Sequence, residues 1–140
     1  MPPFYIADFE RVTDEAFSFL TRRYGYAPCP VERGGLWGTG YLRRYVRDQQ
    51  EVSVCFGDAD SHYLCTVSFR DDAGQANAPQ YTTRDLATLL VKRYPAFVHP
   101  TRSNLSGDTT PESIVRNYGK LVGEYAVDVI EGDFSAFAHQ

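Results

Sequence analysis

The glycine-dense stretch from Gly35 to Gly40 has the spacing that begins a phosphate-binding loop. Such a loop continues with Lys and then Ser or Thr, but Tyr41 and Leu42 follow here. The stretch also leads into a predicted strand, so no helix N-terminus would meet the phosphate. We interpret it as a flexible start of a strand and expect no nucleotide cofactor.

Asp58, Asp60 and His62 lie close together and could offer oxygen and nitrogen ligands to a metal ion. They lack the regular oxygen spacing and the closing Glu of a calcium-binding loop, and Asp is common in tight turns. In the expected hairpin, Cys55 lies opposite His62, a thiol–imidazole arrangement that ordinary cross-strand packing explains better. We predict a turn here and no metal site.

A nucleophilic enzyme needs a base that another group orients, and the only histidines are His62, His99 and His139. His139 is next to the C-terminus, and His99 lies in a long loop before Pro100. No G-x-S-x-G or H-E-x-x-H motif is present. We therefore assign no catalytic residue and expect a binding protein, with a small enzyme as the alternative.

The composition bounds the class of protein. With 43% apolar and 23% charged residues, a chain of 140 residues can form one hydrophobic core, so a single domain over residues 1–140 is expected. No apolar run is long enough for a membrane span, and no secretory pattern opens the chain, which predicts a cytoplasmic protein. Cys29, Cys55 and Cys65 lack C-x-x-C spacing and are interpreted as buried thiols. Twelve Arg against two Lys favour a bacterial origin.

The apolar spacing predicts three helices. The first covers residues 8–24 and ends before Gly25. The second has Thr82 as its N-cap and ends at Pro95. The third follows Thr110-Pro111, is stopped by Gly132, and buries one stripe of side chains: Ile114, Tyr118, Leu121, Val122, Tyr125 and Val129. Residues 133–137 are predicted to fold back and place two rings, Phe134 and Phe137, in the core.

Three antiparallel strands are predicted near residues 40–47, 51–56 and 62–69. A turn centred on Asp58-Ala59 would pair Val54 with Tyr63 and Val52 with Cys65. The inner side chains of the second and third strands are then Val52, Val54, Phe56, Tyr63, Cys65, Val67 and Phe69. In the first strand, Tyr41/Arg43/Tyr45 and Leu42/Arg44/Val46 are equally plausible inner sets. The predicted fold is α+β: a small antiparallel sheet of three or more strands packed against an N-terminal helix and two C-terminal helices.

The formal net charge of −4 belongs to the last quarter of the chain. Within it, Glu124, Asp128 and Glu131 have spacings of four and three, which predict a shared face of the third helix. Like charges there repel and oppose the helix dipole, so the face is either solvated, paired with an arginine such as Arg43 or Arg44, or kept for a basic partner. Nucleic acid is not expected as a partner.

The C-terminal residues 121–137 contain the pattern Y-A-x-D-V-x-x-G-D-F-S-x-F. This ending resembles that of a group of small bacterial proteins, some of which are similar to immunity proteins of polymorphic toxin systems. The resemblance implies a compact intracellular binding protein with no catalytic residues to carry over. We expect no cofactor.

Two functions follow as expectations. The first is a protein-binding module of immunity type that neutralises a toxin by surface complementarity, with Trp37, Tyr41, Glu124, Asp128 and Glu131 as candidate contacts and a basic toxin domain as partner. The second is a small enzyme or ligand-binding domain with a pocket between the sheet and the loops at 70–80 and 95–108. The sequence leaves the oligomeric state open.

Overall fold

The structure, a computed structural model, describes residues 4–34, 40–57, 63–71, 83–101, 103–104, 109–133 and 135–137. In chain order the elements are α1 (Ile6–Ala16), α2 (Ser18–Tyr24), β1 (Ala27–Pro28), β2 (Glu32–Gly34), β3 (Gly40–Arg47), β4 (Gln50–Phe56), β5 (Cys65–Asp71), β6 (Thr83–Asp85), α3 (Leu86–Arg93), α4 (Pro111–Tyr125), α5 (Val127–Ile130) and a short 3-10 helix (Ser135–Phe137). The predicted α+β class is confirmed, with helices from both ends of the chain on an antiparallel sheet.

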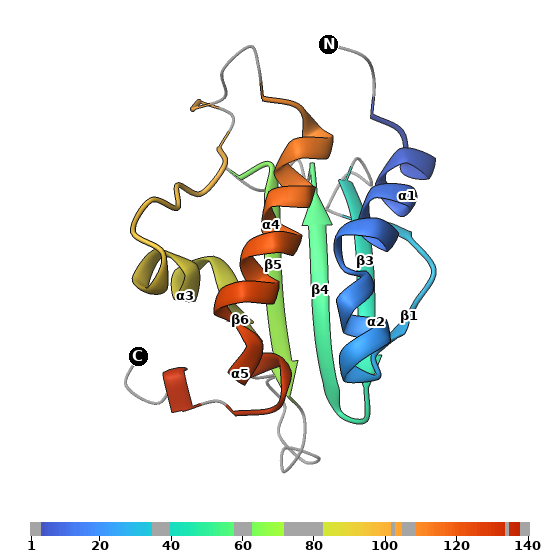
Figure 1. The fold of residues 1–140 in the computed structure, drawn as a ribbon. Helices are drawn as coiled ribbons and strands as arrows, with labels where there is room; N and C mark the ends of the chain where they lie inside the picture. The colour runs from blue at the N-terminus through green and yellow to red at the C-terminus, as the bar shows by residue number, and fades with distance from the viewer. Residues whose placement is uncertain are drawn as a thin grey trace.

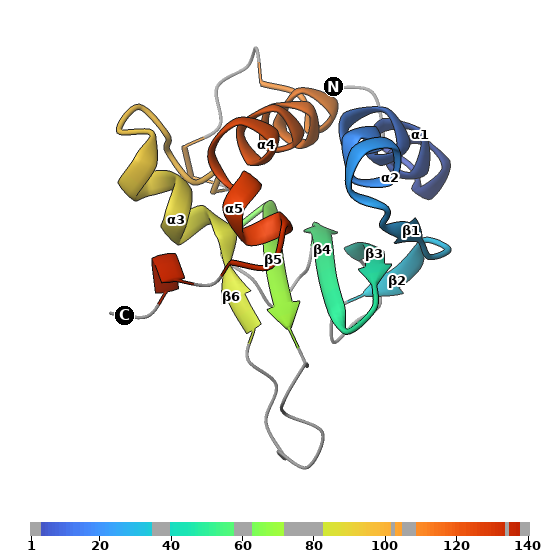
Figure 2. The ribbon, with the colours of Figure 1, turned by 60° about the horizontal axis from the view of Figure 1, so that its bottom comes forward.

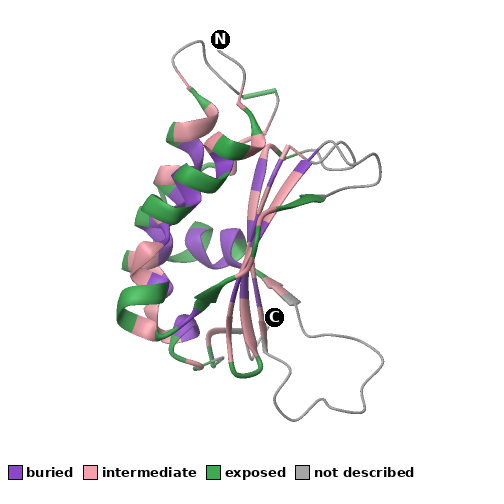
Figure 3. Ribbon diagram, turned by 90° about the vertical axis from the view of Figure 1, so that its right-hand side faces the viewer, coloured by how far each residue is buried: buried purple, intermediate pink, exposed green. Residues whose placement is uncertain are grey.

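The molecule has two layers (Figure 1). Helices α1, α2, α4 and α5 lie across one face of the sheet, and α3 lies toward the β5 and β6 side, as Figure 2 shows from below. Figure 3 shows that the described helices all lie on one side and that the buried residues line the space between the layers. The fully buried side chains include Phe9, Phe17, Leu20, Val52, Val54, Val67, Phe69, Leu86, Leu90, Val122 and Ile130. None of the helices described combines the length and the apolar character that crossing a bilayer requires.

The described strands pair antiparallel in the order β1-β3-β4-β5-β6, and β2 also pairs with β3. Val52 lies opposite Phe69, four positions beyond the predicted Cys65, and Val54 lies opposite Val67. The predicted pairs are therefore wrong, but an even displacement keeps six of the seven predicted side chains on the inner face. The exception is Tyr63, which precedes β5 and is exposed. Because the connection from β4 to β5 is longer than the predicted turn, Cys55 pairs with Thr66 and not with position 62.

Strand β3 turns Tyr41, Arg43 and Tyr45 toward the helices, which decides between the two sets left open by the sequence. Tyr45 is 1% exposed and its hydroxyl donates to the carbonyl oxygen of Thr13 at 3.0 Å. Burial raises the pKa of this phenol to about 12. Arg43 is almost fully buried and reaches Asp14 at 2.8 Å. On the inner face of β3, an arginine and a tyrosine thus occupy buried positions that aliphatic residues usually fill.

The N-terminal helix predicted for residues 8–24 is two helices, because Phe17 has φ −110° and ψ 16° and interrupts it. The break lets the Phe17 ring turn inward, where it is fully buried and stacks on Tyr45. Gly25 ends α2 with φ 73°, a conformation that glycine adopts without strain, as predicted. Shortly after this turn, Ala27 and Pro28 form the short strand β1.

Helix α3 begins later than predicted. Asp85, and not Thr82, is its N-cap, and its carboxylate accepts a hydrogen bond from the backbone N–H of Ala87 at 2.8 Å. Thr83–Asp85, which include the cap, form β6, and this strand pairs with β5. Three residues that the sequence prediction placed in the helix, Thr83–Asp85, therefore form an edge strand of the sheet.

Helix α4 begins as predicted: Thr110 caps it by accepting from the backbone N–H of Ser113 at 3.2 Å. It ends at Tyr125, because Ala126 (φ −120°, ψ 21°) separates it from α5, so the prediction of one helix up to Gly132 is wrong. The predicted buried stripe is confirmed except at Tyr125, which is half-buried and stacks on Tyr94 with ring centroids 5.3 Å apart. Phe134 and the side chain of Phe137 lie outside the described residues.

Candidate functional site

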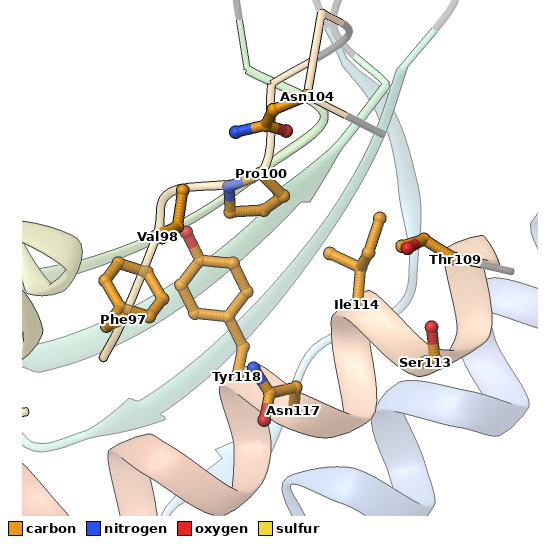
Figure 4. Close-up of a pocket in the computed structure, with 9 residues that line it drawn as sticks. All are labelled: Phe97, Val98, Pro100, Asn104, Thr109, Ser113, Ile114, Asn117 and Tyr118. Atoms are coloured by element: carbon orange, nitrogen blue, oxygen red, sulfur yellow. The ribbon is translucent and has the colours of Figure 1, made fainter. Parts of the chain in front are cut away.

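A cavity of about 630 Å³ lies between the segment 97–104 and the first half of α4 (Figure 4). Its described lining is free of formal charge: Phe97, Val98, Pro100, Asn104, Thr109, Ser113, Ile114, Asn117 and Tyr118. This size is typical of sites that bind a small molecule. The sequence alternative placed a pocket against the loop at 95–108, and the cavity lies there, although its second wall is α4 and not the sheet.

Pairing with the start of β5 fixes the outer wall of the cavity. The backbone N–H of Leu64 donates to the carbonyl oxygen of Pro100 at 3.0 Å, and Tyr63 and Thr101 form an isolated antiparallel bridge. Asn104 then braces the loop, because its side chain accepts from the N–H of Thr101 at 2.9 Å and donates to the carbonyl oxygen of His99 at 3.0 Å. This wall is held by backbone contacts distant in sequence.

Tyr118 forms the inner end of the cavity, and Figure 4 shows its hydroxyl directed toward Val98 and Pro100. The hydroxyl donates to the carbonyl oxygen of Cys65 at 3.3 Å and lies 3.4 Å from Nδ1 of His99. Burial raises the pKa of the Tyr118 phenol and of the Cys65 thiol, and lowers the pKa of His99. All three groups are therefore neutral near pH 7.

Among the described lining residues, Asn117 offers an exposed amide that makes no hydrogen bond. The other polar groups are less available: Ser113 completes the cap of α4, and Asn104 braces its own loop. The cavity thus combines apolar walls with one free amide, a group that both donates and accepts. Such an amide suits an uncharged polar group, for example a peptide bond.

Two exposed apolar side chains belong to the outer wall of the cavity or to the segment paired with it. Val98 is 71% exposed. The ring of Tyr63, 40% exposed, stacks on His99 with centroids 3.7 Å apart. A large apolar side chain kept in water next to a pocket is typical of an interaction surface.

The predicted aromatic contacts do not meet at this cavity. Trp37 lies outside the described residues. Tyr41 is half-buried on the inner face of the sheet, its ring packs on Phe9, and its hydroxyl donates to the carbonyl oxygen of Phe4 at 3.0 Å. Tyr41 therefore helps to hold the N-terminal segment, and a contact with a partner stays a prediction.

The three predicted acidic contacts do not share one helix. Glu124 belongs to α4, Asp128 to α5, and Glu131 follows α5. Asp128 forms a two-point ion pair with Arg93 of α3 at 2.7 and 2.8 Å, which lowers the pKa of the carboxylate. Its charge is therefore compensated by Arg93, and not by Arg43 or Arg44 as the sequence suggested.

Glu124 and Glu131 are exposed. Glu124 lies ten residues after Ile114 on α4, about 15 Å along the helix axis. The two exposed carboxylates can act at a distance from the cavity but do not line it.

The positions considered for a metal, Asp58, Asp60 and His62, lie outside the described residues. In the rest of the chain that the structure describes, no group of three His, Cys, Asp or Glu side chains is placed to hold a metal ion. What the described residues around the cavity offer is apolar contact and neutral hydrogen bonding.

Sequence reasoning missed Val98 and Asn117. The only local signal was a valine in a predicted loop, since Asn117 lies on the exposed side of an amphipathic helix, where Asn is ordinary. Comparisons with protein-family models, with curated proteins and with solved structures found no match to this chain. Its function is therefore inferred from this geometry.

Proposed function

We propose that this chain is a protein-binding module that receives a segment of its partner in the cavity between residues 97–104 and α4. An apolar side chain of the partner enters beside Ile114 and Tyr118, and Asn117 pairs with the partner backbone. Val98 and Tyr63 extend the contact around the mouth.

The observation that carries this proposal is the exposure of Val98 at the edge of an uncharged cavity. Isolated exposed valines are ordinary on a protein surface. Here the valine lines a cavity of about 630 Å³ and directly precedes His99, which stacks on Tyr63, so apolar surface and concave shape occur together. Interfaces draw most of their affinity from such an apolar centre surrounded by polar groups.

Within this class, the proposed type is an immunity protein that neutralises a toxin in the bacterial cytoplasm. The resemblance of residues 121–137 to the ending of such proteins supports it. The exposed carboxylates of Glu124 and Glu131 would then attract a basic toxin domain and chiefly accelerate its association. This charge is separate from the neutral cavity, so affinity and association rate should respond to different variants.

The test compares two exposed valines. Val98→Asp places a charge at the mouth of the cavity, whereas Val91→Asp makes the same change on α3, where Val91 is 52% exposed and outside the cavity. Tagged wild type and both variants are expressed in the native host, and co-purified proteins are quantified by mass spectrometry. A partner that uses the cavity is retained by wild type and Val91→Asp and lost by Val98→Asp.

The partner found in this way is then purified and its affinity measured by calorimetry. Burying an unpaired carboxylate at the centre of an interface should weaken binding at least about a hundredfold, equivalent to a loss of about 3 kcal/mol. Equal binding by both variants would place the interface elsewhere. Equal melting temperatures of the variants show that the effect is not one of folding.

A small uncharged ligand is the second candidate, because the cavity volume lies in the range of small-molecule sites. Native mass spectrometry of the purified chain separates the two. A retained small molecule that Val98→Asp releases would favour this candidate over a protein partner.

A further inference from the structure

A second groove, of about 370 Å³, lies at the other end of the helical layer, between α2 and the second half of α4. Figure 1 shows these two helices side by side on the sheet. The groove is lined by cations, aromatic rings and small residues: Ala16, Ser18, Phe19, Arg22, Arg23, Tyr24, Gly119, Lys120 and Gly123. No acidic residue is among the described residues that line it, although the chain carries a net charge of −4.

The three cations of the groove are unpaired among the described residues. Arg22, Arg23 and Lys120 are exposed and make no hydrogen bond or ion pair with any described residue. Elsewhere, Arg93 binds Asp128, and Arg116 binds Glu15. The positive charge of the groove is therefore available to a ligand.

The dipole of α2 explains only two of the three cations. Cations in the last turn of a helix offset its dipole, and Arg22 and Arg23 hold such positions. Lys120 comes from the middle part of α4 and has no such role there. Three cations from two separate helices thus face one space.

Two rings form the apolar part of the groove. Phe19 and Tyr24 meet edge to face with centroids 6.4 Å apart. Gly123 lies beneath Phe19, where an added Cβ would be 3.5 Å from the ring. The absence of a side chain at Gly123 leaves a shallow floor next to the cations.

Negative groups near the groove are already engaged or stand outside it. The carbonyl oxygen of Tyr24 at the end of α2 accepts from Nη1 of Arg47 at 2.9 Å. Glu15 is bound by Arg116. Glu124 follows Lys120 by one helical turn, but the two make no ion pair and Glu124 does not line the groove.

We propose that this groove binds an organic phosphate monoester, with Arg22, Arg23 and Lys120 around the phosphate and Phe19 and Tyr24 against the organic group. Three cations match a dianion better than a singly charged carboxylate, and guanidinium groups bind phosphate oxygens in pairs. The rings favour a ligand with an apolar or aromatic part. This inference goes beyond the protein-binding role and uses other residues.

The test is a titration with phenyl phosphate, followed by 15N–1H NMR at pH 7.5 in low salt without phosphate buffer. Saturable shifts are expected for amides of α2 and of residues 119–123, and the affinity should fall as salt is added. Inorganic phosphate should bind more weakly, because it lacks the organic group that contacts the rings. A polyglutamate peptide should compete poorly.

Two double variants of equal net charge give the control. Arg22→Gln with Lys120→Gln should weaken phenyl phosphate binding about tenfold, because two charge-assisted contacts are lost. Arg33→Gln with Lys92→Gln removes two other exposed cations that are unpaired among the described residues and should leave the affinity unchanged. Retained affinity in the first variant, an equal loss in the second, or no saturable shift in the wild type would each overturn the proposal, as would tighter binding of polyglutamate than of phenyl phosphate. Val98→Asp should keep this binding, so failure here is distinguishable from failure of the protein-binding role.

Discussion

Two glycines one turn apart on α4 should respond in opposite directions to the same substitution. At Gly119, an added Cβ would lie 2.9 Å from the carbonyl carbon and from the Cβ of Ala16, and closer still to the carbonyl oxygen. The carbonyl group belongs to the backbone of α1 and the Cβ is fixed to it, so α1 and α4 would have to separate. At Gly123 the nearest atoms are ring carbons of Phe19 at 3.5 Å, an ordinary contact.

The expected magnitudes follow from two opposing contributions. Replacing a helical glycine by alanine stabilises the folded state by about 0.5–1 kcal/mol. At Gly119 this gain is outweighed by overpacking, which destabilises by about 1–3 kcal/mol. Moving the helices apart would also lengthen the Arg11–Glu112 contact of 3.1 Å. Gly119→Ala should therefore lower the free energy of unfolding by about 1–2 kcal/mol, and Gly123→Ala should raise it by about 0.5 kcal/mol.

Urea unfolding followed by circular dichroism measures both values, and equal m-values would show that the extent of unfolding is the same. Because the two variants share the helix, the residue type and the change, the difference between them isolates the approach of α1. If Gly119→Ala were as stable as Gly123→Ala, the close contact between α1 and α4 would be refuted.

Three further predictions concern the contacts around α3 and α4. A double-mutant cycle with Arg93→Gln and Asp128→Asn should give a coupling energy of about 1 kcal/mol, because the ion pair is well aligned but one-third exposed. A coupling energy near zero would contradict the role of this pair in joining α3 to α5. Tyr125→Ala should lower the free energy of unfolding by about 1–2 kcal/mol in urea, because the half-buried ring mainly stacks on Tyr94, and a loss above about 3 kcal/mol would place it in the core. Burial lowers the pKa of His99 below its usual value of 6.5, so the unfolded chain binds more protons just below that pH and stability should fall between about pH 7 and pH 5. His99→Gln should flatten this part of the pH profile in urea melts, and an unchanged slope would show that His99 does not carry it.

The sequence predicted those features of the fold that depend on neighbouring residues. Gly25 and Thr110 mark helix ends through their own backbone and side-chain chemistry. The inner face of β4 and β5 was predicted correctly because alternation survives an even error in register. The register itself was wrong because it depends on the length of the connection, for which residues 58–62 carry only turn-like composition.

Features that depend on distant residues were not predictable from spacing. No Gly or Pro announces the helix breaks at Phe17 and Ala126. Phe17 turns inward because Tyr45 of β3 lies below it, at a centroid distance of 6.0 Å. Asp128 looked like part of an uncompensated acidic face because its partner, Arg93, comes from another helix.

The cavity also depends on residues that are distant in sequence. Its outer wall is held by the hydrogen bond between Leu64 and Pro100, which are 36 positions apart in the chain. Burial also affects its chemistry, because it raises the pKa of Tyr118 and lowers the pKa of His99 and so favours the neutral form of both groups. By residue type a histidine could serve in catalysis or metal binding, and the sequence predicted neither role; the environment of His99 favours a neutral contact.

The two proposed sites lie at different ends of one helix, which makes their independence testable. Ile114 of the cavity and Lys120 of the groove are six residues apart on α4, about 9 Å along its axis. They share no lining residue and no ion pair among the described side chains. If α4 has a single position, binding at one site does not change the affinity of the other. The changes in binding free energy caused by Val98→Asp and by the Arg22/Lys120 double variant should then add. If phenyl phosphate bound in the groove changes the affinity for the partner, α4 must instead have two positions against α1. Gly119 lies where α1 and α4 approach most closely, so its substitution would then alter the coupling between the sites.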